Sequence, residues 1–214
     1  MSFFYKRLEP ENRMLFGVVF HKEIESVMKS HLPGIVLAGA LIVLPNIAAA
    51  QPTPEAMVSA AREAMQPLSM LEGTWTGTGT FTLGPGQSSE ASVVETAEFR
   101  LSDTVLVIEG IGRAGGDQGQ VVHNALGIIS WDAAEQRYRF RAYRLGGQYV
   151  DADFELDGNA INWSFEDPRA GMIEYHIEIE PGVSWTESGR ISRDGGANWY
   201  PFFEMHLRPG NMDE

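Results

Sequence analysis

The 214-residue chain contains no cysteine, which excludes disulfide frameworks, thiolate nucleophiles and cysteine metal ligands. Basic residues are also few: 16 Lys and Arg stand against 29 Asp and Glu, for a net charge of −13. Every basic residue after position 50 is an arginine. A surface this acidic repels phosphate backbones and anionic lipid headgroups. We therefore expect neither nucleic acid nor a membrane surface as a partner.

The chain also lacks a run of apolar residues long enough for a comfortable membrane span. Its apolar run Ile35–Leu44 is shorter than the roughly 20 residues that a spanning helix needs. Lys29 precedes this run, and three alanines follow it just before Gln51. The pattern is typical of an export signal over 28–50. It predicts a periplasmic or secreted protein with no stable membrane span after signal removal; the alternative is an uncleaved anchor.

Residues 1–27 precede this signal, although an export signal normally begins at the initiator methionine. We interpret 1–27 as a disordered extension or as the product of a misassigned translation start at Met1 in place of Met28. The alternative is a genuine cytoplasmic extension that carries Lys6, Arg7 and Arg13.

Residues 51–71 predict an N-terminal helix. Thr53 suits the cap position and Pro54 the first turn, and apolar residues recur at helical spacing up to Leu71. Pro67 is expected to bend the helix or end it early. We expect the helix to pack on the end of the following domain, with a lid over a pocket as the alternative.

From 72 to 209 the apolar period changes to that of β-strands, and 210–214 forms a short C-terminal tail. Turn-forming pairs such as Gly146-Gly147 and Pro181-Gly182 separate short runs of β-branched and aromatic residues. Short connections of this kind make sequential strands antiparallel neighbours. The pattern predicts about ten strands, at 73–83, 91–101, 104–112, 120–131, 136–145, 148–157, 160–166, 172–180, 183–193 and 197–208.

The register of the hairpin over 137–157 can be predicted from the alternation of residue types in the sequence. Arginines alternate with aromatic residues in its first strand, and acidic residues alternate with apolar ones in its second. A three-residue loop of Gly146, Gly147 and Gln148 places the arginines of the first strand opposite the acidic residues of the second, and the aromatic residues opposite the apolar ones. Each face of the hairpin is then either charged or apolar throughout. This loop predicts the pairs Arg141–Asp153, Arg139–Glu155, Phe140–Phe154 and Tyr138–Leu156. The arginines are expected to face water, with an anion pocket as the alternative.

About ten antiparallel strands with one apolar face must close up or pack as two sheets. We predict an all-β fold, an antiparallel up-and-down calycin-like barrel with the helix at its N-terminus. An interior of this size has room for a small ligand, which we expect to be largely apolar. The expected ligand-binding wall consists of Tyr138, Phe140, Phe154, Trp163 and His123. A fully packed interior would leave a structural or interaction role.

The stretch "LEGTWTGTGTF" begins the first strand with a Gly-x-Trp motif at Gly73 and Trp75. Together with the terminal "SRDGGANWYPFFEMHLRP", it resembles the exported bacterial lipocalin-like (calycin-type) β-barrel domains of unknown function and, more distantly, the lipocalins. That resemblance implies barrel closure by Gly73, Trp75 and Arg208. We expect Arg208 to return beside the first strand and to stack on the indole ring.

The same start, Gly-Thr-Trp-x-Gly-x-Gly, is also similar to nitrobindin, a barrel that binds haem through one histidine near its C-terminus. This resemblance implies a haem-binding or redox barrel as the alternative function, with His206 carried over as the ligand. His123 is a second haem-ligand candidate, because it shares a strand face with apolar residues. Otherwise we expect no cofactor and no metal.

An enzyme of unrecognised type is the remaining alternative. The sequence holds no G-x-S-x-G elbow and no H-E-x-x-H motif, so no catalytic residue is assigned. His176 and Glu178 lie two apart on one strand face and are the weak candidates for a metal pair. The patterns favour a binding protein.

Overall fold

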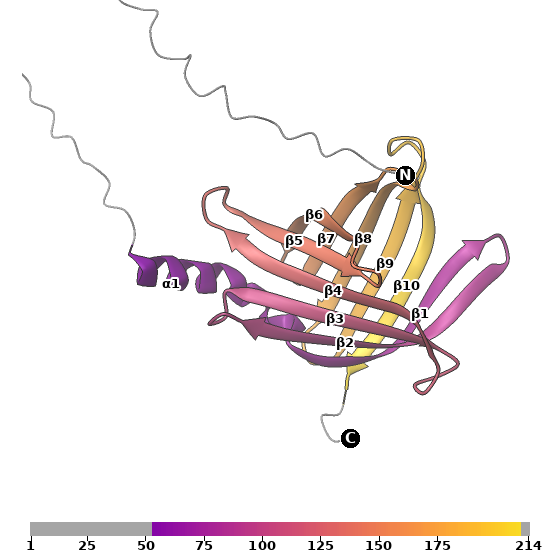
Figure 1. The fold of residues 1–214 in the computed structure, drawn as a ribbon, viewed down its shortest axis with the longest axis horizontal. Coiled ribbons are helices and arrows are strands. Elements are labelled where there is room, and N and C mark those ends of the chain that lie inside the picture. Colours follow the sequence, from indigo (N-terminus) through magenta and orange to yellow (C-terminus); the bar gives the residue numbers. More distant parts are fainter. Residues whose placement is uncertain (1–52, 211–214) are drawn as a thin grey trace, which may run out of the picture. The chain divides into compact units, whose positions relative to one another are not determined.

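The structure, a computed structural model, describes residues 53–210. The expected extension 1–27, the export signal 28–50 and residues 211–214 of the tail lie outside the described residues. The described part begins with an α-helix and a 3₁₀ helix and continues as ten strands (Figure 1). The elements are α1 (Pro54–Met65), η1 (Gln66–Leu71), β1 (Gly73–Gly84), β2 (Gln87–Arg100), β3 (Val105–Ala114), β4 (Gln120–Asp132), β5 (Arg137–Arg144), β6 (Tyr149–Asp157), β7 (Ala160–Asp167), β8 (Gly171–Glu180), β9 (Ser184–Ser192) and β10 (Tyr200–Pro209).

Helix α1 begins just after Thr53, the predicted cap, but the α-helix ends at Met65, inside the predicted range 51–71. The Thr53 side chain accepts a hydrogen bond from the Ala56 backbone N–H at 3.2 Å, which satisfies one of the free donors of the first turn. The α-helix stops at Met65 and the chain continues as η1, which contains Pro67, because proline cannot donate to the helical ladder. Neither helix between residues 53 and 210 has the length and apolar content that a membrane span requires.

The ten strands form a closed, antiparallel, up-and-down barrel, as predicted. Each strand pairs with its neighbours in sequence, and β1 pairs with β10 to complete the ring. Gly77 makes this last pairing fit, since a β-carbon there would lie 2.0 Å from the His206 carbonyl oxygen. Closure leaves no free sheet edge along the paired segments.

Two hairpins differ from the expected strand limits. The first hairpin is longer, because β1 runs to Gly84 and β2 starts at Gln87. The last strand starts later than predicted, at Tyr200, because Asp194 folds the preceding residues into a loop. Its carboxylate accepts bonds from the Asn198 side-chain amide at 2.7 Å, from the Asn198 backbone N–H at 2.9 Å and from Ser192 Oγ at 2.8 Å, and these bonds lower the pKa of Asp194 to about 2.

The β5–β6 hairpin has the predicted faces, but the predicted register is wrong by two residues. Arg141 lies opposite Asp151, and Phe140 lies opposite Ala152. The three-residue loop is Leu145–Gly147, closed by a bond from Arg144 N to Gln148 O at 2.9 Å. A shift of two residues preserves every inside–outside assignment, so the arginines still face outward. Arg141 makes a bidentate pair with Asp151, at 2.6 and 2.9 Å.

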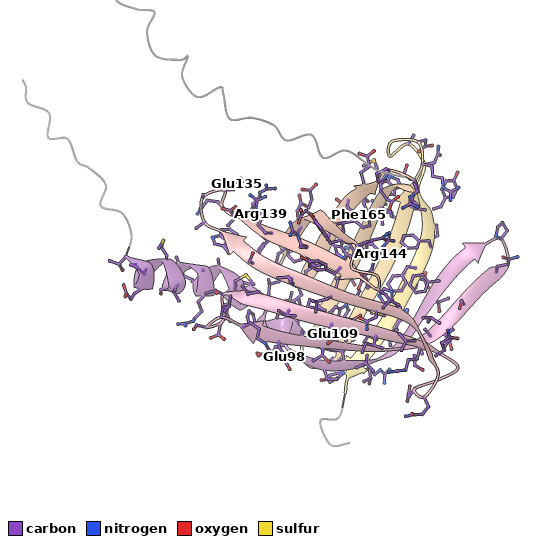
Figure 2. The ribbon with its side chains drawn as sticks, in the orientation of Figure 1. Glu98, Glu109, Glu135, Arg139, Arg144 and Phe165 are labelled. Atoms are coloured by element: carbon purple, nitrogen blue, oxygen red, sulfur yellow. The ribbon has the colours of Figure 1, made fainter. Side chains whose placement is uncertain are left out.

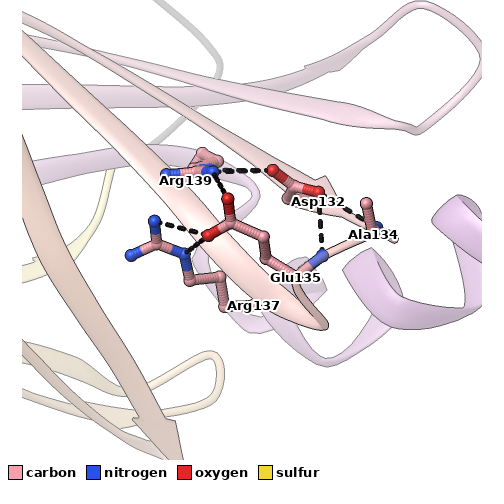
Figure 3. A network of polar contacts seen from close by, with 5 residues as sticks. All are labelled: Asp132, Ala134, Glu135, Arg137 and Arg139. Atoms are coloured by element: carbon pink, nitrogen blue, oxygen red, sulfur yellow. Dashed lines mark hydrogen bonds and ion pairs between the residues drawn. The ribbon is translucent and has the colours of Figure 1, made fainter. Parts of the chain in front are cut away.

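Arg139 pairs across the β4–β5 turn instead of with Glu155. Its guanidinium binds Asp132 at 2.8 Å and Glu135 at 2.8 Å, and Arg137 also contacts Glu135 (Figure 3). Asp132 also accepts the backbone N–H groups of Ala134 and Glu135, which fixes the turn. Exposed pairs of this kind contribute little to stability individually.

The helical segment packs into the end of the barrel where β1 begins. Met65, Leu68 and Leu71 are fully buried and join the barrel core. Two polar groups fix the segment there: Tyr138 donates to the Ala64 carbonyl at 2.7 Å, and the Trp75 indole N–H donates to the Leu71 carbonyl at 2.8 Å. We call Met65, Leu68 and Leu71 the plug. Its packing confirms that the helix covers one end of the domain.

Replacing Leu68 with alanine is expected to lower the free energy of unfolding by about 2 to 5 kcal/mol, because it leaves a void in the plug. Leu145→Ala is the matched control, since Leu145 is 72% exposed and its truncation is expected to change stability by no more than about 0.5 kcal/mol. Urea denaturation followed by tryptophan fluorescence measures both. Equal effects of the two substitutions would show that the plug does not stabilise the barrel.

Candidate functional site

The barrel interior contains a cavity of about 180 Å³ that is partly open to solvent. Its wall is mostly apolar and aromatic, and no lysine or arginine lines it among the described residues. The lining residues on β1 to β3 are Phe81, Ala91, Val93, Glu95, Ile108, Gly110 and Gly112; those on β4 to β7 are His123, Ala125, Gly127, Phe140, Ala142 and Trp163; those on β8 to β10 are Tyr175, Ile177, Trp185, Glu187, Phe203 and Met205.

Small residues on adjacent strands make room for this space. Gly110 and Gly127 are inward-facing positions where other strands carry larger side chains. A β-carbon at Gly127 would lie 2.9 Å from the Phe140 ring, and one at Gly110 would lie 2.3 Å from the Glu95 carboxylate. The backbone at these positions therefore serves as the surface on which an aromatic ring and a carboxylate rest.

Two carboxyl groups face the cavity, Glu95 from β2 and Glu187 from β9. Burial raises the pKa of Glu95 to about 8, and repulsion by Glu187 adds to the rise. Burial also raises the pKa of Glu187 to about 7, although the indole N–H groups of Trp163 and Trp185 oppose this rise. Both side chains are only half-buried by accessible surface, because their open side faces the cavity. Each can exchange a proton near neutral pH.

Trp185, which lines the same cavity, carries an incompletely satisfied donor. Trp185 is buried, and its indole nitrogen has no hydrogen-bond partner of good geometry among the described residues. A buried donor without a partner is costly. It is directed towards Glu187, whose pKa it lowers.

The remaining titratable groups of the wall are His123 on β4 and Tyr175 on β8. Burial lowers the pKa of His123, which favours the neutral imidazole. Burial raises the pKa of Tyr175, so its hydroxyl keeps its proton. The Tyr175 ring stacks on Trp163, with centroids 4.0 Å apart and an angle of 5° between the planes.

Three of the five expected wall residues line the cavity: Phe140, Trp163 and His123. Phe154 and Tyr138 point to the same side but lie in the core against Phe140 and the plug. The sequence analysis did not assign Glu95 or Glu187 to the site. The sequence does contain an indication of Glu95, because this residue lies between Val93 and Ala97 on the strand face that points into the barrel.

The residues expected to close the barrel lie together at one end, but Arg208 does not stack on Trp75. Trp75 is buried and meets Trp185 edge to face at 6.0 Å. Arg208 does return beside β1, opposite Thr76, yet its side chain is exposed, because it lies on the outward face of β10. Gly73 has a φ of +120°, a conformation that glycine tolerates best.

Two of the three histidines named in the alternative predictions, His206 and His176, are exposed. His206 alternates with the buried Met205 and Leu207 and therefore faces away from the cavity. His176 contacts the Asn162 amide at 2.8 Å and Glu178 at 3.3 Å. Within residues 53–210, no group of three or more such side chains is arranged to hold a metal ion.

A larger hollow of about 740 Å³ lies over the outer face of β6 to β10. Its walls include solvated side chains such as Asp153, Glu155 and His176. Charged residues elsewhere on the outside, such as Glu98 and Glu109, are likewise exposed (Figure 2). The inner cavity is the better candidate, because it combines apolar walls with a few polar groups of shifted pKa.

No family model matches the chain, and no curated protein matches it. The crystal structure of Rv2717c from M. tuberculosis is similar, with a TM-score of 0.52 and 15% sequence identity. The match covers 69% of this chain and 97% of that one. At this identity the likeness concerns the fold alone.

The raised pKa values predict that the barrel loses stability as pH rises. The folded protein holds protons on Glu95 and Glu187 that the unfolded chain releases above about pH 4.5. The free energy of unfolding therefore falls between about pH 5 and about pH 8, by at most about 1.4 kcal/mol per pH unit for each proton.

Glu95→Gln is expected to flatten this fall, because a neutral amide has no proton to lose. Glu90→Gln, at an exposed position of the same strand, is the control and is expected to retain the wild-type slope. Denaturant titrations across this pH range measure the effect. An unchanged slope in the Glu95 variant would contradict the assignment.

Proposed function

We propose that the barrel binds a small, largely apolar molecule in its inner cavity. The observation that carries the proposal is the largely apolar space inside the barrel among Phe140, Trp163 and Phe203, which the plug and the aromatic core do not fill. Apolar burial supplies affinity in sites of this kind, and a few polar groups orient the ligand.

The volume limits the size of the ligand. An apolar cavity of about 150 Å³ accepts benzene, and the cavity here measures about 180 Å³. A molecule with one aromatic ring and a short side chain matches this space.

The lipocalin-like relationship is part of the proposal. It is supported by the Gly-x-Trp start at Gly73 and Trp75, the up-and-down closure and the N-terminal plug. Lipocalins close with eight strands, whereas this barrel has ten. The relationship is therefore one of architecture.

The haem alternative has less support than a small apolar ligand. His206 faces outward, which leaves His123 as the candidate ligand. Sites for drug-sized molecules measure roughly 300 to 1,000 Å³, and a haem is no smaller than such molecules, whereas this cavity measures about 180 Å³. We therefore assign no haem-dependent step to the protein.

Filling the cavity tests the binding proposal. The neutral probe 2-phenylethanol is expected to bind the wild type and to quench tryptophan fluorescence, since Trp163 and Trp185 line the space. Ala142→Trp places an indole in the cavity and is expected to weaken binding by about tenfold or more. Ala134→Trp, in the exposed β4–β5 turn, is the control. Undetectable wild-type binding, or equal binding by both variants, would overturn the proposal.

We also propose that the protein acts outside the cytoplasm, in the periplasm or after secretion. The support is the signal-like pattern over 28–50, with its alanines before Gln51. Expression of the full chain in a bacterium with an export pathway is expected to yield a mature protein that begins at Gln51. N-terminal sequencing of the purified protein checks this, and a mature chain that still carries residues 1–27 would contradict it.

A further inference from the structure

We propose that the ligand of the inner cavity is a small organic cation, a protonated amine on an apolar body, which the carboxylates of Glu95 and Glu187 bind between them. This inference rests on the proposed binding function and specifies its ligand class. It is carried by the lining of the cavity, where two acids from different strands face one space with no basic partner.

The cavity wall carries two acidic side chains without a basic partner. Buried carboxylates are normally paired with a lysine or arginine, but neither residue lines this space among the described residues. His123 does not supply the charge, because its burial favours the neutral imidazole. Near neutral pH a proton on each acid takes the place of that cation, so ionisation of the pair requires a positive charge from the ligand.

Neighbouring residues of the wall leave room for both acids at the cavity. The Glu95 carboxylate lies directly on Gly110, where a β-carbon would meet its oxygen at 2.3 Å. Glu187 lines the same space as Trp163 and Trp185, whose indole N–H groups lower its pKa. The glycine opposite Glu95 therefore leaves room for that carboxylate, and the two indoles favour the ionised form of Glu187.

Aromatic rings line the cavity together with the two acids. Trp163 and Tyr175 stack in parallel at 4.0 Å, and Phe140 meets Trp163 edge to face at 5.2 Å. The faces of such rings attract cations, most strongly when water is excluded. A carboxylate beside aromatic rings therefore favours an ammonium group over a hydroxyl of the same size and disfavours an anion.

Binding of a cation is also expected to release protons from the protein. Both acids hold protons up to near-neutral pH because their pKa values are raised, and an ammonium group favours their ionised forms. The other titratable groups facing them across the cavity are His123 and Tyr175. We therefore expect protons to leave the protein when an amine binds, and amine affinity to rise from about pH 5 to about pH 8.

Two probes of nearly equal size test the inference: 2-phenylethylamine, which stays protonated in this pH range, and the neutral 2-phenylethanol. Isothermal titration at pH 7 is expected to show the amine binding about tenfold or more tightly than the alcohol. Titration in phosphate and in Tris is expected to give different apparent enthalpies, because released protons are taken up by the buffer.

Glu187→Gln and Glu95→Gln are each expected to weaken amine binding by about tenfold or more while changing alcohol binding by less than about threefold. Glu90→Gln, on the outer part of β2, is the control and is expected to leave both affinities unchanged. The wild-type comparison of the two probes at several pH values decides the question even where a variant fails to fold.

The outcomes separate this inference from the binding proposal. Alcohol binding that equals or exceeds amine binding overturns the cation assignment and leaves the cavity as a site for neutral molecules. Amine binding that is unaffected by either glutamine variant also overturns it. Binding of neither probe overturns the proposed function as well.

Discussion

The pairing of β1 with β10 is the contact on which the rest of the molecule depends. Every other strand pair joins neighbours in sequence, whereas this one joins the two ends of the domain. It turns one face of a twisted sheet into an interior, and it is possible only because Gly77 leaves room for the backbone of β10. Without it, the inward-facing rings and both inward-facing acids would be exposed to water.

The interior so formed has two distinct regions. One is densely packed, where Leu68, Leu71 and Trp75 meet the inward residues of the strands. The other is open, because Gly110, Gly127 and Ala142 supply little volume. Stability comes from the first region, while the second contains groups whose burial opposes folding at neutral pH. This division is common in binding proteins, where the site retains strain that the surrounding core offsets.

Much of the architecture follows from alternation in the sequence, because side chains on a strand point to opposite faces in turn. Alternation identified the ten strands and placed Arg139 and Arg141 outside. It could not choose between Asp151 and Asp153 as the partner of Arg141, since both lie on the same face and a two-residue shift satisfies either. The register was decided by loop geometry, with Gly146 and Gly147 both at positive φ.

The candidate site was only partly predictable for the same reason. Alternation gives the face of a residue but not its height along the barrel, so Tyr138 and Phe154 were grouped with Phe140 although they lie at the level of the plug. Glu95 shares its face with apolar residues, and a carboxylate in such a series is easily attributed to solvent. Only the three-dimensional closure places it opposite Glu187.

The contact between Glu95 and Gly110 has a consequence for comparing sequences. Since any side chain at position 110 would displace the carboxylate at position 95, the two positions are sterically linked across adjacent strands. Descendants of this barrel that gain an alanine or larger residue at position 110 must turn the carboxylate away from its present place or lose the acid, whereas those that keep the glycine can keep the carboxylate where it lies. Covariation of positions 95 and 110 would therefore distinguish barrels that keep a carboxylate inside from barrels that share only the fold.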